Sequence, residues 1–546
     1  MATFWAFAAI LFSSLFALVL GNGSSLPIVD LGYENGEFYN FSNIRYGQAP
    51  VGNLRFRALL APVTQSNIVN NGSVGVTCPQ VVPPWQILAG MYLGSRLSNT
   101  SFDLAAAEAA VAAMPPQPLD PKTSEDCLFL DVFVPRAVFP KNSHGSGKGA
   151  PVLVWITGGG FIAGDKTAVG DQLYSPEGLI KASQTAPSKG LIFVSINYRL
   201  GAFGFLAGSE VEADGNANAG LHDQRLALEW VQNNIHLFGG DKGRVTVMGE
   251  SGGGSSIMHQ ITAFGGKSPL PFTQAIMQSP AFISKASNWQ NEVTFKTFLN
   301  HLNVSSLQEA RNLPSENLIN GNIAQISAGG FVDFSYGPTV DGTFTPGIPQ
   351  RLLSSGAFKK NVNVMVAYNS WEGGLFQSPY VTNLSTLTDL IKVIIPRVSP
   401  GALSEITDGL YPPVFGGFRG YKTWGELQAQ LTADAALVCG TTSISRAFGN
   451  QTYAYEFAIA PGIHGQDMAY TFATGPDPSI DYNVAKSLQQ YITSFVDNGT
   501  PVAIGSPAFP KYGPDNKILK FGHTISQTTD PAANERCEWW NKALYY

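Results

Sequence analysis

The stretch RVTVMGESGGGSSIM, residues 244–258, constrains the fold more than any other part of the chain. A β-branched apolar run ends at Met248, and GESGG (residues 249–253) separates it from residues that favour a helix. GESGG fits G-x-S-x-G, which holds its serine on a strained turn between a strand and a helix. The flanking glycines are needed because a Cβ there would collide with a neighbouring element. The alternative is an ordinary glycine-rich turn.

Short hydrophobic runs alternate with longer helical or irregular stretches along the chain. Runs that are apolar at nearly every position are typical of strands buried on both faces, and therefore of a mostly parallel sheet. Residues 220–238 predict a helix, because Leu226, Trp230 and Ile235 recur at helical spacing. We predict an α/β fold with helices on both faces of the sheet, as one domain over residues 22–546. Strands are expected at residues 151–157, 191–198, 244–249, 363–369 and 452–459.

Composition narrows the class of function. Hydrophobic residues make up 44% of the 546-residue chain and charged residues only 13%, which favours a large globular core over disorder. The net charge is −6 and no basic run occurs. Because binding to phosphates needs clustered Lys and Arg, nucleic acid is excluded as a partner. No pattern predicts an oligomeric state.

The N-terminus predicts export from the cell. Residues 1–21 are interpreted as a signal peptide, because the first charge is Asp30 and Gly21 suits cleavage. The alternative is a membrane anchor, since the uncharged stretch nearly spans a bilayer. An even number of cysteines, four, suits an oxidising compartment and allows three pairings. The chain is thus expected to be secreted and glycosylated, with sequons at Asn22, Asn40, Asn71, Asn99, Asn303, Asn383, Asn450 and Asn498.

A second glycine-rich segment, GGGF (residues 158–161), follows the strand predicted at residues 151–157. Consecutive glycines let backbone N–H groups face a substrate with no side chain between them, which suits an oxyanion hole. The N–H groups of Gly159, Gly160 and Gly252 are the predicted donors. The rival interpretation is a dinucleotide fingerprint through Gly158, Gly160 and Ala163. Turn signals in residues 165–173, where a phosphate-capping helix should run, argue against it.

Several ordered motifs together resemble the type-B carboxylesterase/lipase family. They are GESGG, GGGF, SEDCLFLDVFVP (residues 124–135), NYRLGAFGFL (197–206), NAGLHDQRLALEWVQNNI and FGGD (238–241). The family includes cholinesterases and large fungal lipases, and the resemblance runs from about residue 43 to Cys537. It implies an α/β-hydrolase fold, a serine esterase activity and no cofactor. The chain departs from the family at Gly252, which is often Ala, and at Pro280, where Gly is usual.

The resemblance implies a catalytic triad in the order serine, acid, histidine. Ser251 is the expected nucleophile. The acid is Glu372, in NSWEGGLF (residues 369–376) just past a predicted strand, with Asp333 and Asp341 as competitors.

The base is expected to be His464, in the loop PGIHGQD that follows the strand predicted at residues 452–459. His259 is close to Ser251 in sequence, but it lies eight residues along a helix, about 12 Å away. His222 and His236 lie within or at the end of another predicted helix, where a histidine is more often a surface or core side chain. His144, His301 and His523 lack supporting context.

The resemblance also implies two disulfides, Cys78–Cys127 and Cys439–Cys537. With all cysteines paired and no H-E-x-x-H motif, no metal is expected. A catalytically silent adhesion protein on the same fold is the alternative of another class, although such relatives lack triad members.

The expected function is hydrolysis of lipid-like carboxylic esters, with a lipid surface as a partner. The alternative is a carboxylesterase for small soluble esters. Residues 79–126, between Cys78 and Cys127, are the candidate lid loop, and within them residues 102–114 predict an Ala-rich, apolar helix. That helix is expected to cover the Ser251 cavity when closed and to meet lipid when open. A static wall helix is the alternative. Chain length and alcohol preference are left open.

Overall fold

The structure is a computed structural model that describes residues 16–17, 29–35, 38–62, 69–70, 72, 75–115, 119–139, 149–167, 174–185, 189–282 and 284–545. Apart from Phe16 and Ala17, the expected signal peptide lies outside these residues, as do His144 and the sequons at Asn22 and Asn71. Among the described residues, no helix has both the length and the apolar character needed to cross a membrane.

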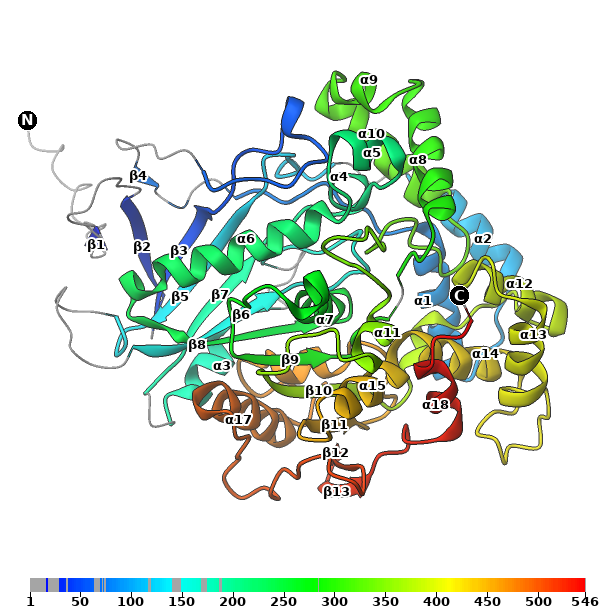
Figure 1. Cartoon of the computed structure of the whole chain (residues 1–546). Helices are drawn as coiled ribbons and strands as arrows, with labels where there is room; N and C mark the ends of the chain where they lie inside the picture. Colours follow the sequence, from blue (N-terminus) through cyan, green and yellow to red (C-terminus); the bar gives the residue numbers. More distant parts are fainter. Residues whose placement is uncertain are drawn as a thin grey trace, which may run out of the picture.

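A large twisted sheet runs through the middle of the molecule (Figure 1). Its strands are β1 (Phe16–Ala17), β2 (Val29–Asn35), β3 (Phe38–Arg45), β4 (Val69–Asn70), β5 (Phe129–Pro135), β6 (Ala150–Ile156), β7 (Ile192–Ile196), β8 (Gly240–Glu250), β9 (Gln274–Gln278), β10 (Asn363–Asn369), β11 (Tyr453–Phe457), β12 (Lys517–Phe521) and β13 (Ile525–Thr529). They follow the order β1-β2-β3-β5-β7-β6-β8-β9-β10-β11-β12-β13, with β4 beside β2. From β7 to β12 all neighbours are parallel, whereas β3, β5 and β13 pair antiparallel.

Strand β6 is apolar at every position because both of its faces are buried. Val152 and Val154 pack into one hydrophobic cluster, and Leu153 and Trp155 pack into a second on the opposite face. All four side chains are fully buried. The predicted α/β fold with a mostly parallel sheet is confirmed, because both faces are covered by helices as a parallel sheet requires.

The helices divide among these clusters. The first cluster contains residues of α4 (Gly201–Phe205), α5 (Ser209–Asp214), α6 (Ala219–Asn234), α7 (Gly252–Thr262), α8 (Asn288–Leu302), α9 (Leu307–Arg311), α10 (Ser315–Ser327), α11 (Pro349–Ser354) and α15 (Cys439–Ala447). The second contains residues of α3 (Glu177–Ser183), α16 (Asp467–Thr471) and α17 (Tyr482–Asn498). A third joins α1 (Pro84–Leu97), α12 (Leu384–Ile394), α13 (Pro400–Ser404), η5 (Glu405–Leu410), α14 (Trp424–Ala433), η6 (Asp434–Val438) and α18 (Glu535–Asn541). The short turns η1 (Gly52–Leu54), η2 (Ile235–Phe238), η3 (Ala263–Gly266) and η4 (Glu372–Phe376) complete the elements.

The five predicted strands correspond to β6, β7, β8, β10 and β11, and the predicted helix to α6 followed by η2. The strands β1 to β5, β12 and β13 were not predicted, and neither was β9, which lies between β8 and β10. Strand β9 has only five residues, and two of them are glutamines, Gln274 and Gln278, so its hydrophobic pattern is weak.

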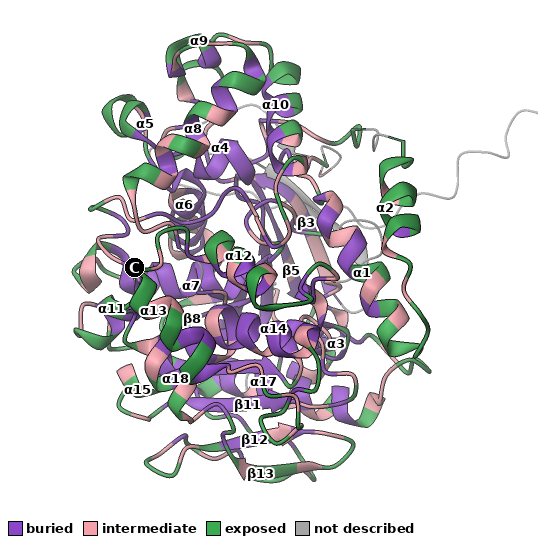
Figure 2. Ribbon diagram, turned by 90° about the vertical axis from the view of Figure 1, so that its right-hand side faces the viewer, coloured by how far each residue is buried: buried purple, intermediate pink, exposed green. Residues whose placement is uncertain are grey.

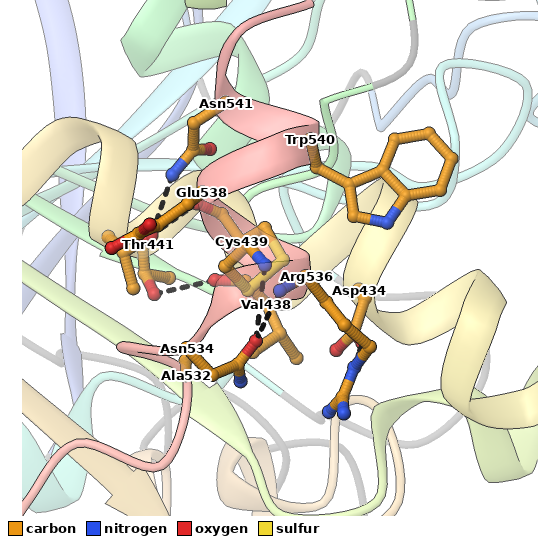
Figure 3. The surroundings of a disulfide bond; sticks show 12 residues. Asp434, Val438, Cys439, Thr441, Ala532, Asn534, Arg536, Glu538, Trp540 and Asn541 are labelled. Carbon is orange, nitrogen blue, oxygen red and sulfur yellow. Dashed lines mark hydrogen bonds and ion pairs between the residues drawn. A yellow bond between two sulfur atoms is a disulfide. The ribbon is translucent and has the colours of Figure 1, made fainter. Parts of the chain in front are cut away.

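Both expected disulfides are present. Cys78–Cys127 closes the loop that carries α1 and α2 (Leu104–Ala112), and Cys439–Cys537 ties α15 to α18 (Figure 3). Asp434 approaches the second pair, but disulfide sulfurs are not thiolate ligands, so this group is no metal site. Instead Asp434 accepts a hydrogen bond from Arg536 Nε at 2.7 Å.

Helices α1 and α2 differ in burial although they share one loop. In α1, Trp85, Leu88, Ala89 and Leu93 are buried, whereas α2 buries only Ala107 (Figure 2). The predicted helix at residues 102–114 thus exists, but its apolar composition does not place it inside the protein.

Candidate active site

The turn between β8 and α7 holds Ser251 as the G-x-S-x-G pattern predicts. Ser251 has φ 55° and ψ −120°, which non-glycine residues rarely adopt. Its N–H donates to the carbonyl of Gln278 on β9 at 2.9 Å, which fixes the turn to the neighbouring strand. A Cβ at Gly249 would lie 2.6 Å from the backbone carbon of Gly253, and one at Gly253 would collide with the carbonyl of Ile156. Both glycines are therefore required by close backbone packing.

The glycine-rich segment after β6, residues 158–161, packs against the turn that holds Ser251. Gly159 and Gly160 have φ values of 88° and 61°, in the left-handed region that favours glycine. A Cβ at Gly252 would lie 3.3 Å from the nitrogen of Gly160 and 3.4 Å from that of Phe161. The glycine-rich segment and the N-terminus of α7 are thus adjacent. This arrangement brings together the residues predicted to donate to an oxyanion.

The predicted acid and base meet at the same edge of the sheet. Glu372 begins η4 directly after β10, and His464 follows β11, the parallel neighbour of β10. The Nδ1 of His464 lies 2.5 Å from Oε2 of Glu372. Because both residues leave the carboxyl ends of parallel strands, the topology brings together side chains 92 positions apart.

Glu372 is held rigidly, because its carboxylate is buried and has several donors. Oε1 accepts hydrogen bonds from Ser279 Oγ at 2.5 Å and from the backbone N–H of Asn369 at 2.6 Å. These donors leave Oε2 for the imidazole. The carboxylate can therefore orient the ring and stabilise its cation.

Two further carboxyl groups near His464 were missed by the sequence analysis. Oε1 of Glu250 lies 3.2 Å from Nε2 of His464, and burial raises the pKa of Glu250 to about 8. Asp467 accepts from Asn369 Nδ2 at 3.1 Å and from Gln278 Nε2 at 3.0 Å, and burial raises its pKa to about 6. The sequence signal for each acid was its position beside a motif residue. Glu250 immediately precedes Ser251, and Asp467 lies three residues after His464.

The acidic side chains around His464 raise the pKa of its imidazole. Burial opposes a charged imidazole, but the negative charges of Glu250 and Glu372 outweigh it and raise the pKa of His464 to about 9. The ring contacts Phe376, with centroids 5.3 Å apart. His464 thus lies in a buried, electronegative pocket that favours a proton on the ring once it is acquired.

The competing residues lie elsewhere or have other partners. His259 is buried on α7, where burial lowers its pKa to about 3, and its Nε2 lies 3.4 Å from Ser284 Oγ. Asp341 accepts from Asn218 Nδ2 at 2.7 Å and from backbone N–H groups of its own turn. Asp333 lies in the cavity wall, and its Oδ1 accepts from the N–H of Ser335 at 2.7 Å.

A cavity opens beside Ser251. Its wall is mainly apolar and is built by the segment of residues 332–338 together with parts of η4, α12 and η6. The apolar lining residues include Phe161, Val332, Phe334, Phe376, Ile394 and Leu437. Lys285 also lines the cavity, and the sequence analysis did not single it out. The only sign of it was a basic residue shortly after the β9 segment.

The candidate lid does not line this cavity. No described residue of 79–126 belongs to the cavity wall. Helix α2 instead contacts α1 through the Tyr92–Phe102 ring pair, and Tyr380 OH donates to Glu108 at 2.7 Å. Helix α1 supports the wall from behind, because Trp85 packs edge-on against Phe334. The role of residues 102–114 as a lid stays a prediction.

Comparisons with known proteins give the family and the fold of the chain. A carboxylesterase from Aspergillus clavatus, patB, is 39% identical over 96% of this chain and 97% of its own. A secreted lipase of Arthroderma benhamiae is 30% identical over 77% of this chain and 83% of its own. The crystal structure of Aspergillus niger EstA has the same fold, with a TM-score of 0.77 and 24% identity over 94% of this chain and 96% of that one. The carboxylesterase family matches residues 27–540, so the chain belongs to the type-B carboxylesterase family of carboxylic ester hydrolases.

Proposed function

We propose that the chain hydrolyses carboxylic esters through an acyl-enzyme on Ser251. The observation that carries the proposal is the 2.5 Å contact between His464 Nδ1 and Glu372 Oε2, at the edge of the sheet where the strained turn presents Ser251. A buried carboxylate that orients an imidazole beside a serine is the arrangement that activates a serine nucleophile.

The reaction proceeds in two steps. His464 takes the proton of Ser251 Oγ as the oxygen attacks the ester carbonyl, and the protonated ring then gives that proton to the leaving alcohol. Water attacks the acyl-enzyme with His464 again as the base, which releases the acid and restores Ser251. In each step the N–H groups of Gly159, Gly160 and Gly252 stabilise the oxyanion, and loss of one such donor costs about 3 kcal/mol.

Labelling with a fluorophosphonate probe tests this assignment. We expect stoichiometric labelling at Ser251, loss of labelling and of ester hydrolysis in Ser251→Ala, and strong loss of both in His464→Ala. Ser255→Ala on α7 is the matched control, because its buried Oγ has no hydrogen-bond partner among the described residues. Full hydrolysis by Ser251→Ala would refute the role of Ser251. Absence of both labelling and hydrolysis in the unsubstituted protein would favour the catalytically silent alternative for this fold.

The substrate has an apolar acyl or alcohol part. The cavity beside Ser251 is lined mainly by aromatic and aliphatic side chains, and burying such a group stabilises the complex by about 25 cal/mol for each Å². A similarity to enzymes named carboxylesterase and secreted lipase supports the same class. A series of esters of increasing acyl length should show kcat/KM rising with the first added methylenes.

The second candidate function is hydrolysis at a lipid surface. The observation that favours it is the exposure of α2, whose apolar residues are mostly exposed. Met114, just beyond the helix, is 44% exposed. Exposed apolar surface of this kind marks contact sites. Action on lipid predicts a jump in rate when the ester forms droplets. Smooth saturation through the solubility limit would instead indicate a carboxylesterase for small soluble esters.

Secretion is part of the proposal. The uncharged N-terminal segment, the two disulfides and the similarity to a secreted lipase support it. Sequencing of the protein from culture medium should give a mature N-terminus near residue 22. A retained Met1 would contradict cleavage. Glycans are expected first at the exposed sequons Asn99, Asn303, Asn383 and Asn498.

A further inference from the structure

Lys285 places a positive charge at the wall of the cavity that holds Ser251. Its Nζ donates to Thr294 Oγ1 on α8 at 2.8 Å and to the backbone carbonyl of Ser335. Ser335 and Tyr336 line the same cavity, and Nζ lies 5.8 Å from the centre of the Tyr336 ring. Two neutral oxygens therefore fix the ammonium group at the cavity wall without neutralising it.

No carboxylate pairs with this ammonium group among the residues that the structure describes. Asp333 is on the same wall, but its Oδ1 is engaged by the N–H of Ser335. Burial lowers the pKa of Lys285 to about 8, and the charge of Asp333 partly opposes that shift. Lys285 is thus mainly charged at neutral pH. Lys285 is half-buried, and an incompletely paired charge that is partly withdrawn from water is costly, which calls for a compensating role.

Among the described residues, the other cation of the site is the imidazolium of His464, which Glu372 and Glu250 flank at Nδ1 and Nε2. Lys285 is the single basic side chain among the described residues that line the cavity. The chain as a whole is negative, at −6, so its overall field does not attract anions. Near His464 the acids Glu250, Glu372 and Asp467 gather. An anionic group on a substrate would therefore be repelled at the reacting end and attracted at Lys285.

We propose that Lys285 determines specificity by binding an anionic group, such as a carboxylate or an enolate, in the acid or the alcohol part of the ester. This inference rests on the proposed function, because it concerns the same cavity and the same Ser251 chemistry. It narrows the substrate class from apolar esters to esters that join an apolar body to one negative group.

Two pairs of matched esters test the proposal. For the acid part, 4-nitrophenyl hydrogen adipate is compared with 4-nitrophenyl 6-methylheptanoate, in which an isopropyl group replaces the carboxylate. For the alcohol part, 4-(acetoxymethyl)benzoate is compared with 4-isopropylbenzyl acetate. The quantity measured is the ratio of kcat/KM for the anionic ester to that for the neutral ester. A loss of folded or active protein lowers both values equally and leaves the ratio unchanged.

Three variants give distinct expectations at pH 7. Lys285→Met should lower the ratio about tenfold or more in at least one pair, the size expected for a lost charge-assisted hydrogen bond. Lys285→Arg should retain most of the ratio. Asp333→Asn keeps an acceptor for Ser335 but removes the competing charge, so it should raise the ratio. The control Lys392→Met removes an exposed charge of α12, next to the cavity-lining Val393, and should leave the ratio unchanged.

The outcomes separate this inference from the proposed function. An unchanged ratio in Lys285→Met for both pairs, with neutral esters still hydrolysed through Ser251, overturns the role of Lys285 alone and leaves it as a clamp between α8 and the segment of Ser335. An equal drop for Lys392→Met would also overturn it, because general attraction would then explain the preference. Neutral-ester hydrolysis that persists in Ser251→Ala would refute the proposed function itself.

Discussion

The two sides of the catalytic cavity are held in different ways. On one side, Ser251 lines the cavity, and Glu372 and His464, its proposed catalytic partners, follow buried parallel strands as Ser251 does. Hydrogen bonds join Ser251 to β9, Glu372 to Asn369 of β10, and His464 to Glu372. The other side is backed by the Cys78–Cys127 loop, where Trp85 of α1 contacts the wall residues Asp333 and Phe334. Helix α2, in the same loop, does not reach the wall. Chemistry is thus positioned by the sheet, whereas the loop contributes shape.

The largest effect should follow a change on the sheet side. Glu372→Gln keeps the size of the side chain but removes the charge that holds His464 Nδ1, which leaves the imidazole without its orienting partner. We expect kcat to fall by about a thousandfold to ten-thousandfold, with Ser251 unchanged. Single-turnover kinetics with a 4-nitrophenyl ester measure the loss. A decrease below tenfold would mean that Glu372 is not the acid of the triad.

A smaller effect is expected where α1 supports the wall. Trp85→Ala removes a ring that contacts Phe331 and Phe334, each with centroids 5.3 Å away, and frees the carbonyl of Asp333. The lost packing should reduce stability by about 3 kcal/mol. Thermal unfolding at a fixed scan rate and kcat/KM should both report it.

Phe102→Ala, next to α2, tests whether the two helices of the Cys78–Cys127 loop differ in their support of the cavity wall. Phe102 is half-buried and contacts Tyr92 outside the cavity wall, so its loss should cost less than that of Trp85 and should leave kcat/KM unchanged. Equal losses for both variants would break the distinction between the two helices.

The next prediction concerns the pH dependence of kcat/KM. Glu250 lies 3.2 Å from His464 Nε2 and helps to raise the pKa of the ring, which must be neutral to act as a base. Glu250→Gln removes a charge that stabilises the imidazolium, so the pKa falls and the acid limb of kcat/KM against pH moves to lower pH. We expect a shift of about one pH unit, equivalent to about 1.4 kcal/mol. A limb that stays in place, or moves to higher pH, would contradict this coupling.

The smallest effect is expected on α2. Lysine at Val111 or Met114 should change the hydrolysis of a soluble short-chain ester by less than about twofold, because neither residue lines the cavity and substitutions away from key contacts are nearly neutral. With an emulsified ester the same variants should lose rate. Ile504→Lys, at a residue 82% exposed in another part of the chain, is the charge-matched control. Equal rates on the emulsion for all three variants would remove the lipid-surface role.

The sequence predicts the sheet side better than the loop side for a physical reason. Gly249 and Gly253 are dictated by backbone packing that leaves no room for a Cβ, and the strands around them are apolar because both faces are buried. Such requirements leave a pattern in a single sequence. The family resemblance implied the pairing of His464 with Glu372 and both disulfides, and the structure contains these contacts.

The residues of the cavity wall show no comparable pattern in the sequence. Lys285 and Asp333 are brought to Ser251 by segments that lack regular structure, so no periodicity marks them. For α2, the Ala-rich composition predicted a helix correctly, but small side chains are compatible with solvent as well as with a core. Burial there depends on what packs against the helix, which composition does not encode.

The Cys439–Cys537 bridge sets an order for biosynthesis. A ribosome releases the chain from its N-terminus, so Ser251, Glu372 and His464, the proposed triad, have emerged before Cys537 does. Ala436 and Leu437, which line the cavity, lie just ahead of Cys439, whose disulfide partner is 98 positions downstream. We expect the nascent polypeptide to carry its nucleophile without a finished binding site. Hydrolytic capacity would then appear only after translation ends, and not while the protein is still attached to the ribosome.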